Sequence, residues 1–442
     1  MFKFEGLREG GELPARVRIP GKDEAHAAML CYSPDEGVSM SLIDIQANFI
    51  DAFSADVMGE CDRPEVIHGE LPGGCPFTLL GCFKRPGLHG ANGIGHSTYS
   101  AGSLVAGWHV ESDQVPCVKS VELSLTMLDV WMTNTYTVQS RDPDVRKGVT
   151  GKGIRATACF VDQFEHYAKE TGIALRSHQT IGFGKTDPAV TTINNRSSLM
   201  LKFDNPVTIS AAKEELYRLQ CLFSLLCGIQ SHPTTIVLRP EKDNELGLDR
   251  QAYVLGGYAY KSRDSIVIPD QLLTHQRMVE PYLAEIWAEW QRNIDIYSVP
   301  VELHASTSVF GDQLAQFEYL SAVQALEVLH RRKIPQAGKR RTPLLDRLES
   351  LCEGLSDPLK EALHPRLTKL LEKVKDTRDE LTHSLGHPPE KIFAREELHA
   401  AALWLRWVFT VWMLHALGLP ADVLAKTLGE ERQLKRLRDI VL

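Results

Sequence analysis

The sequence lacks the patterns that mark several common classes of protein. Its nine cysteines are scattered, and none stands in a Cys-x-x-Cys pair, which disfavours both a disulfide framework and a zinc site. It has no His-Glu-x-x-His and no Gly-x-Ser-x-Gly segment, so nothing supports metalloprotease or serine-hydrolase chemistry, and we expect no cofactor. No basic and then apolar stretch of the secretory type opens the chain, so we expect a cytoplasmic protein.

A strong charge of either sign is missing as well. The 442 residues carry a formal net charge of -8, which argues against a protein that coats nucleic acid along its whole surface. The charge is uneven, because residues 314–442 contain 21 Lys and Arg against 18 Asp and Glu. Only this C-terminal third is suited to a polyanion, and only weakly.

One apolar run, residues 400–417, has about the length of a membrane span. Arg406 lies near its middle and His415 near its end, and both side chains are costly in hydrocarbon. We therefore predict a buried helix of a helical bundle and no contact with a membrane.

The first two hundred residues show short apolar segments between Gly, Pro, Asp and Asn, the pattern of β-strands separated by turns. This spacing predicts an antiparallel sandwich or barrel. The predicted strands are 15–19, 27–32, 66–71, 77–83, 104–110, 121–128 and 199–203.

The apolar period becomes helical near residue 210, where Ser210 is a candidate N-cap and Gly228 a candidate stop. Two more strands, 234–238 and 251–260, follow before the chain turns helical at about residue 270. Helices are predicted over 314–332, 343–354, 358–382, 394–417 and 420–440. The predicted fold is α+β and multidomain, with a β-rich, sandwich-like module over 1–270, a helical connector over 271–312 and an all-α bundle over 313–442.

The segment 367–389 contains the most informative motif. On a helical wheel, Arg378 falls inside the apolar stripe formed by Leu370, Val374 and Leu381. A guanidinium in such a place normally requires a carboxylate or a phosphate as partner. The sequence therefore predicts an anion at this arginine.

Two polar residues follow the arginine on the same helix. Asp379 and His383 are four residues apart, so the carboxylate is placed to orient the imidazole. Arg378 and His383, in contrast, are separated by about 140° on an ideal helix and would not converge. They can meet if the helix ends near His383, as Gly386 would allow, or if the arginine of one chain meets the histidine of another.

These residues carry a resemblance. The segment Arg378-Asp379-Glu380-Leu381-Thr382-His383 is similar to the signature of HEPN ribonucleases, in which Arg is followed by Asn, Asp or His and then, after three to five further residues, by His. Residues 317–327 resemble the first bundle helix of the Apea-like HEPN group. The N-terminal region resembles the β-rich module of ApeA-type phage-defence proteins, notably in residues 67–80, 107–110, 128–131 and 222–226.

The resemblance implies a metal-independent endoribonuclease that leaves 2′,3′-cyclic phosphate and 5′-hydroxyl ends. Under this hypothesis His383 transfers protons, Arg378 braces the charged phosphorus centre and Asp379 supports them. The resemblance also implies abortive infection, a homodimer in which two motifs line one cleft, tRNA as a candidate substrate, and an N-terminal module that senses a phage-derived trigger or restrains the nuclease.

Further residues are candidates for support. Arg366, Lys373 and Lys375 precede the motif on its helix and are candidates for contact with RNA backbone, with a solvated helix face as the equally weighted alternative. Glu327 follows Leu326 on an apolar helix, and we expect it to pair with an arginine of the bundle, with Arg378 as one candidate.

Other interpretations stay open. An Arg-x4-His match also occurs by chance at Arg63 and His68, inside a β segment, so the spacing alone is weak. The bundle is alternatively a non-catalytic HEPN dimer that binds RNA or senses a signal, or an assembly factor in which Arg378 pairs internally.

Overall fold

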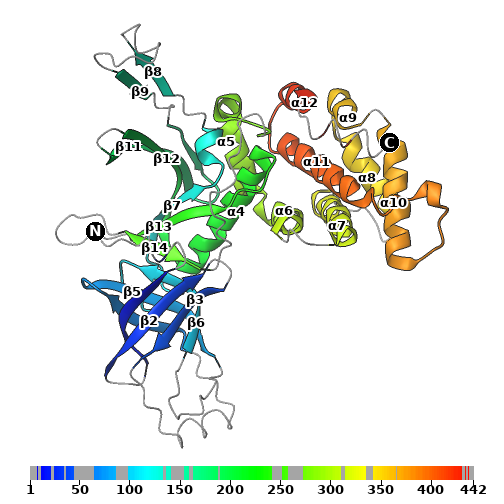
Figure 1. The fold of residues 1–442 in the computed structure, drawn as a ribbon. Coiled ribbons are helices and arrows are strands. Elements are labelled where there is room, and N and C mark those ends of the chain that lie inside the picture. The colour runs from blue at the N-terminus through cyan, green and yellow to red at the C-terminus, as the bar shows by residue number, and fades with distance from the viewer. Residues whose placement is uncertain are drawn as a thin grey trace, which may run out of the picture.

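The structure is a computed structural model in which a β-rich region leads into a helical one (Figure 1). This arrangement confirms the predicted α+β class. The residues described are 7, 11–20, 24–33, 36–43, 64–85, 98–132, 136–140, 154–158, 163–187, 190–240, 251–256, 272–309, 314–334, 342–364, 366–430, 434 and 437.

Six strands at the N-terminal end close into an antiparallel barrel, drawn in blue in Figure 1. Closure occurs because β6 pairs with β3 on one side and with β5 on the other. Alternate side chains point inward, and Val17, Leu30, Met40 and Phe77 fill the interior. The strands are β1 (Glu12–Arg18), β2 (Ala25–Ser33), β3 (Gly37–Leu42), β4 (Val66–Leu71), β5 (Cys75–Lys84) and β6 (Thr98–Ala106).

The barrel continues into an open antiparallel sheet, because β6 also pairs with β14. The strand order from there is β14, β13, β7, β12, β11 and β10, while β8 and β9 form a separate hairpin. These strands are β7 (Val118–Leu125), β8 (Tyr136–Ser140), β9 (Ile154–Ala158), β10 (Glu165–Ala168), β11 (Ile173–Asp187), β12 (Val190–Val207), β13 (Pro233–Pro240) and β14 (Ala252–Leu255). The arrangement is thus a barrel that opens into a sheet, so of the sandwich and the barrel predicted above the structure has the barrel.

Each predicted strand coincides with an observed one, but two extend too far. The segment 104–110 leaves β6 after Ala106, because Gly107 has φ +122° and a Cβ there would lie 2.3 Å from the Gln251 carbonyl oxygen. The segment 121–128 leaves β7 at Leu125, and the short helix α3 (Leu128–Trp131) follows. The part of segment 251–260 beyond residue 256 lies outside the described residues.

The helix predicted near residue 210 is α4 (Ile209–Cys227), which packs against β7. Its N-cap is Thr208 rather than Ser210, since the Thr208 hydroxyl accepts a hydrogen bond from the backbone N–H of Ala211 at 3.0 Å. Gly228 ends the helix with φ +71°, and a Cβ there would lie 2.7 Å from Leu273 Cβ. The predicted stop at Gly228 is therefore confirmed.

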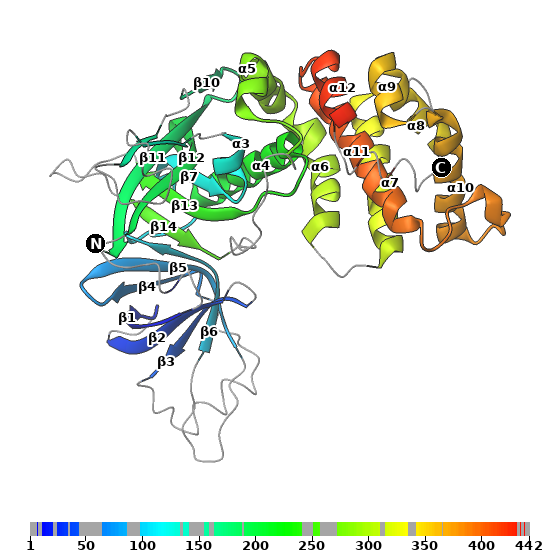
Figure 2. The same cartoon turned by 45° about the horizontal axis from the view of Figure 1, so that its top comes forward.

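The remaining helices form the C-terminal part of the molecule, and Figure 2 shows α11 crossing α7, with α10 at the outer end. The prediction of one helix over 358–382 is wrong, because α9 and α10 are separate and Pro365 stands between them. The helices are α5 (Gln276–Arg292), α6 (Ile294–Val309), α7 (Ala315–Lys333), α8 (Leu344–Glu353), α9 (Asp357–Leu363), α10 (Leu367–His383), α11 (Leu398–Ala416) and α12 (Ala421–Glu430).

The run of 400–417 lies in α11, which is buried between α7 and other helices of the bundle. Among the described residues no helix combines the length and the apolar character needed to cross a membrane. The domain division at residues 270 and 312 stays a prediction. Within the proposed connector, α5 packs on β10 and α6 on α7.

Two apolar cores fill the molecule. One fills the barrel and includes Leu255 of β14, whereas the other begins at Leu80 of β5 and Val105 of β6 and runs from the open sheet through α4 into the bundle. The second core includes Leu123 of β7, Leu222 of α4, Trp404 of α11 and Leu371 of α10. The helix that carries the motif is therefore packed into the same body of side chains as the open sheet.

A partly buried histidine in α6 predicts a pH dependence of stability. The His304 ring stacks on Phe409 at 4.5 Å, and burial together with the charge of Arg406 lowers its pKa well below the usual value. The folded chain thus holds His304 neutral, and its contribution to stability is lost as the pH falls below about 6.5, the ordinary histidine pKa.

We expect the free energy of unfolding in urea to be lower at pH 5.5 than at pH 7.5. The His304→Phe variant, which keeps an aromatic ring but cannot take a proton, should lose less over this range, by an amount of order 1 kcal/mol. An equal loss in both proteins would contradict the assignment to His304.

Candidate active site

The motif helix α10 ends at the residue that carries the imidazole. Leu370, Leu371 and Val374 bury one face of the helix, and Ser384 stops it in a left-handed conformation with φ +50°. The Ser384 N–H still bonds to the Glu380 carbonyl oxygen at 2.9 Å, so the last turn is closed. The helix thus ends at His383, three residues before Gly386, the residue named above as allowing a stop near His383.

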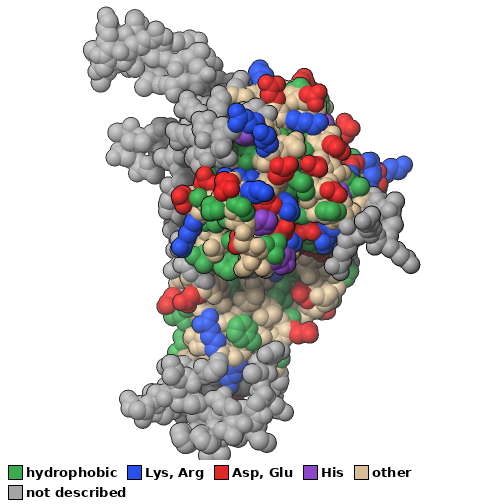
Figure 3. Space-filling model, turned by 90° about the vertical axis from the view of Figure 1, so that its right-hand side faces the viewer, with side chains coloured by type: hydrophobic (Ala, Val, Ile, Leu, Met, Phe, Trp, Pro, Cys, Tyr) green, Lys and Arg blue, Asp and Glu red, His purple; other side chains and the backbone are tan. Residues whose placement is uncertain are grey.

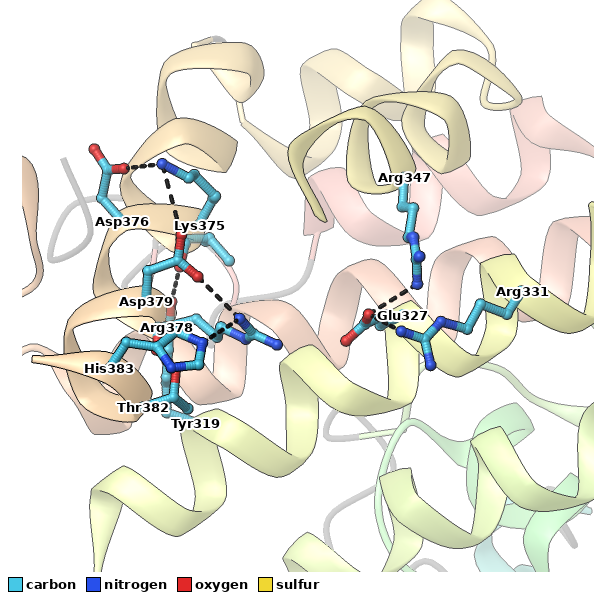
Figure 4. A network of polar contacts seen from close by, with 11 residues as sticks. Tyr319, Glu327, Arg331, Arg347, Lys375, Asp376, Arg378, Asp379, Thr382 and His383 are labelled. Atoms are coloured by element: carbon cyan, nitrogen blue, oxygen red, sulfur yellow. Dashed lines mark hydrogen bonds and ion pairs between the residues drawn. The ribbon is translucent and has the colours of Figure 1, made fainter. Parts of the chain in front are cut away.

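This helix end brings Arg378 and His383 together. Arg378 Nη1 lies 3.5 Å from His383 Nε2, at the outer limit of a hydrogen bond (Figure 4). Of the two arrangements allowed by the sequence, the structure has the first, in which both groups belong to one chain. The Arg378 side chain is 30% exposed and His383 is exposed, so solvent reaches both.

The carboxylate of Asp379 faces the arginine rather than the histidine. Its Oδ1 accepts a hydrogen bond from Arg378 Nη1 at 2.9 Å, and its Oδ2 lies 3.6 Å from Lys375 Nζ. We expected a hydrogen bond between Asp379 and the His383 imidazole, but the described residues do not make one. His383 instead turns toward Arg378 where the helix ends. Asp379 is therefore placed to orient the guanidinium.

The charges of this cluster cancel in pairs. Lys375 bonds to Asp376 at 2.7 Å, which raises the pKa of the lysine, and Arg378 pairs with Asp379. Arg378 nevertheless keeps its Nε and Nη2 donors without a partner among the described residues. This open edge of the guanidinium matches the oxygens of a phosphate.

Of the basic residues expected to bind RNA, Lys375 lies beside the pair, while Lys373 and Arg366 are placed differently. Lys373 lies 3.2 Å from Glu397 and stacks over the Phe393 ring at 4.6 Å, so its charge is already compensated. Arg366 caps the start of α10 and is exposed, about 18 Å along the helix axis from Arg378. With Lys375 also paired, Arg366 is the only one of the three without a carboxylate partner among the described residues.

Glu327 does pair with arginines of the bundle, though not with Arg378. Its Oε1 accepts hydrogen bonds from Arg331 Nη2 at 2.5 Å and from Arg347 Nη1 at 2.8 Å. Arg331 is one helical turn away in the sequence, so this contact could have been predicted. Arg347 comes from α8, and no sequence pattern indicates its approach.

Buried hydroxyls hold α10 in place beneath the pair, and sequence reasoning missed them. The Tyr319 hydroxyl of α7 donates to the Val374 carbonyl oxygen at 2.7 Å. The Thr377 hydroxyl donates to the Lys373 carbonyl oxygen at 2.8 Å and accepts from the Phe393 N–H at 2.9 Å. These bonds fix α10 against α7 and against the segment that follows it.

A helical bundle that presents an Arg-Asp-x3-His motif at a helix end, joined to a β-rich module, defines a two-part protein with a HEPN domain. A family model described as ApeA N-terminal domain 1 matches residues 15–290, and one described as Apea-like HEPN matches residues 320–423. The first match covers more than half of the chain, so the chain belongs to the ApeA family. No curated protein and no solved structure matches it.

Family membership bears on function at a coarse level. HEPN domains are generally RNases and commonly dimerise, and the ApeA family belongs to anti-phage defence. The comparisons thus indicate a nuclease-like defence protein.

Proposed function

We propose that the chain is a metal-independent RNA endonuclease that protects its host against phage by abortive infection. The observation that carries the proposal is the 3.5 Å approach of Arg378 Nη1 to His383 Nε2 at the accessible end of α10. The His383 imidazole, a group suited to proton transfer, stands there beside a guanidinium with open donors. These are the two groups needed to cleave RNA through its own 2′-hydroxyl.

In the proposed reaction His383 accepts the proton of a ribose 2′-hydroxyl, and the freed oxygen attacks the neighbouring phosphorus. The bond from phosphorus to the 5′-oxygen breaks, and that oxygen takes up a proton. The products are a 2′,3′-cyclic phosphate and a 5′-hydroxyl. Arg378 donates from Nε and Nη2 to the non-bridging oxygens as negative charge develops on them, and Asp379 holds the guanidinium from its other side.

A homodimer completes this proposal. One imidazole cannot be base and acid at the same moment, and a second copy of the motif in a shared cleft supplies the other role. Leu385, two residues beyond His383, is 60% exposed, and an apolar side chain at this place is suited to burial between two copies.

The β-rich module is proposed to sense a phage-derived trigger or to restrain the nuclease, because an unrestrained RNase would harm its own cell. The apolar core that joins the open sheet to α10 supports communication between the two parts. We propose cytoplasmic RNA as the substrate, with tRNA as the candidate suggested by the family.

The test is to incubate the purified full-length chain with total RNA and to sequence the new 5′ ends. We expect discrete cuts with 5′-hydroxyl ends, 2′,3′-cyclic phosphates on the other fragments, and full activity in EDTA. Cleavage that disappears in EDTA would refute the metal-independent mechanism. RNA that is bound but not cut, with and without phage extract, would favour a non-catalytic RNA-binding dimer.

A further inference from the structure

A second cationic group lies beside the Arg378 and His383 pair, on α7 and α8. Arg331 and Arg347 both donate to the same oxygen of Glu327. In Figure 4 this triad and the guanidinium of Arg378 face the same space, which is bordered by α7, α8 and α10. Because two guanidinium groups share one carboxylate, the triad has a net positive charge.

The hydrogen-bonding capacity of the triad is only partly used. Arg331 makes one bond, through Nη2, so its Nε and Nη1 have no partner among the described residues, and its side chain is 54% exposed. Arg347 is only 6% exposed and is held by Glu327 and by the Thr342 carbonyl oxygen. Arg331 therefore presents open donors to solvent, while Arg347 is a fixed charge behind it.

The positive charge around Arg347 is not fully compensated. Burial and the charges of Arg331 and Arg378 lower the pKa of Arg347, against the opposite effect of Glu327 alone. Burial, and after it the charge of Arg347, lower the pKa of the neighbouring His330 ring. An anion bound at Arg331 would offset the positive charge around Arg347.

The motif itself does not supply this charge. Its two cations, Lys375 and Arg378, are matched by the carboxylates of Asp376 and Asp379. The face shown in Figure 3 carries basic and acidic side chains side by side, not a continuous basic surface. A polyanion that reaches the motif would thus find an uncompensated positive charge at the triad.

We propose that Arg331, backed by Arg347 and Glu327, binds a second phosphodiester of the RNA strand, next to the one held at Arg378. This inference rests on the proposed function and specifies how the same site engages its substrate. It makes a run of single-stranded RNA the ligand, because a strand presents several phosphates in series. The bond that is cleaved would be selected by the phosphate contacts at both Arg378 and Arg331 rather than by the motif alone.

The inference is tested by RNA binding, which does not require cleavage. In the full-length His383→Ala protein, affinity is measured for single-stranded oligonucleotides of two, four and eight residues over a series of salt concentrations. With Arg331 present, we expect affinity to rise as the strand is lengthened.

In the double variant that also carries Arg331→Ala, the octamer should bind about three- to tenfold more weakly, and the slope of log affinity against log salt should be smaller by about 0.7. Arg331→Lys should keep most of the slope, because it keeps the charge. Arg292→Ala is the matched control, since Arg292 is 52% exposed and likewise paired with a glutamate, but lies on α5. This control should bind as the parent does.

Two results would overturn the inference. One is an octamer affinity and salt slope that Arg331→Ala leaves unchanged. The other is an equal loss for every oligonucleotide length accompanied by a lower melting temperature, which would make Arg331 a structural residue. Failure of the proposed function is distinguishable, because it would be an absence of RNA cleavage by the unmodified chain whatever the binding data show.

Discussion

Substitution of His383 by alanine in the full-length chain is expected to reduce RNA cleavage by a factor of about 10² to 10⁴, because the only proton-transfer group of the motif is removed. Arg378→Ala should lose about 10² to 10³, since the developing charge on the phosphate loses its guanidinium partner. The rate of appearance of 5′-hydroxyl ends measures both effects. Both side chains reach solvent, so we expect little change in melting temperature.

Matched controls exist within the same chain. His399 is 61% exposed and paired with Glu318 at 2.7 Å, so His399→Ala removes an accessible, carboxylate-bound histidine from the same bundle. Arg292→Ala removes an accessible, carboxylate-bound arginine, which lies on α5. Both controls should cleave RNA at the parent rate. Full activity in His383→Ala or in Arg378→Ala would exclude the proposed catalytic pair.

Substitution of Asp379 by asparagine is expected to separate substrate binding from turnover. Asparagine removes the negative charge that holds Arg378 and Lys375, so the cluster becomes more positive and the KM for RNA should fall. The guanidinium loses its charged anchor, and kcat should fall about 10- to 100-fold because a small misplacement at the reacting atoms is costly. Steady-state kinetics on a defined oligonucleotide measure both constants.

The control for this variant is Asp376→Asn, which makes the same change in charge beside Lys375 but does not touch Arg378. It should lower KM to a similar degree with kcat retained. The pH profile of Asp379→Asn distinguishes the two roles considered for the carboxylate. If Asp379 positions the arginine, the inflection due to the histidine keeps its place. A displaced inflection would instead support the original prediction that Asp379 orients His383.

Local signals in the sequence were sufficient to predict much of the fold. The apolar stripe of α4 and the glycine at its end predicted that helix, and apolar segments bounded by turn residues predicted strands such as β4. Closure of the barrel was not predictable, because the pairing of β5 with β6 depends on how six strands curve together. The continuation of the barrel into the open sheet was not predictable either, because it depends on the pairing of β6 with β14, a strand far away in the sequence.

The candidate site, like the fold, was predictable from the sequence only in part. The resemblance to the HEPN signature predicted the pair Arg378 and His383, but its convergence depends on Ser384, a residue type that rarely adopts positive φ. The choice of Asp379 between arginine and histidine is set by side-chain rotamers at a helix end, and no pattern along the chain encodes them. The approach of Arg347 to Glu327 is a tertiary contact between two helices and was equally hidden.

The boundary between the two apolar cores lies inside the β-rich region, where β5 and β6 contribute side chains to both. We expect the barrel to open as one unit, and the open sheet, α4 and the bundle as another, because each group of elements shares its own core. A disturbance of the barrel can therefore be absorbed locally and leave the bundle unaffected. A disturbance of the open sheet is expected to reach α10, because the sheet and α10 share one apolar core.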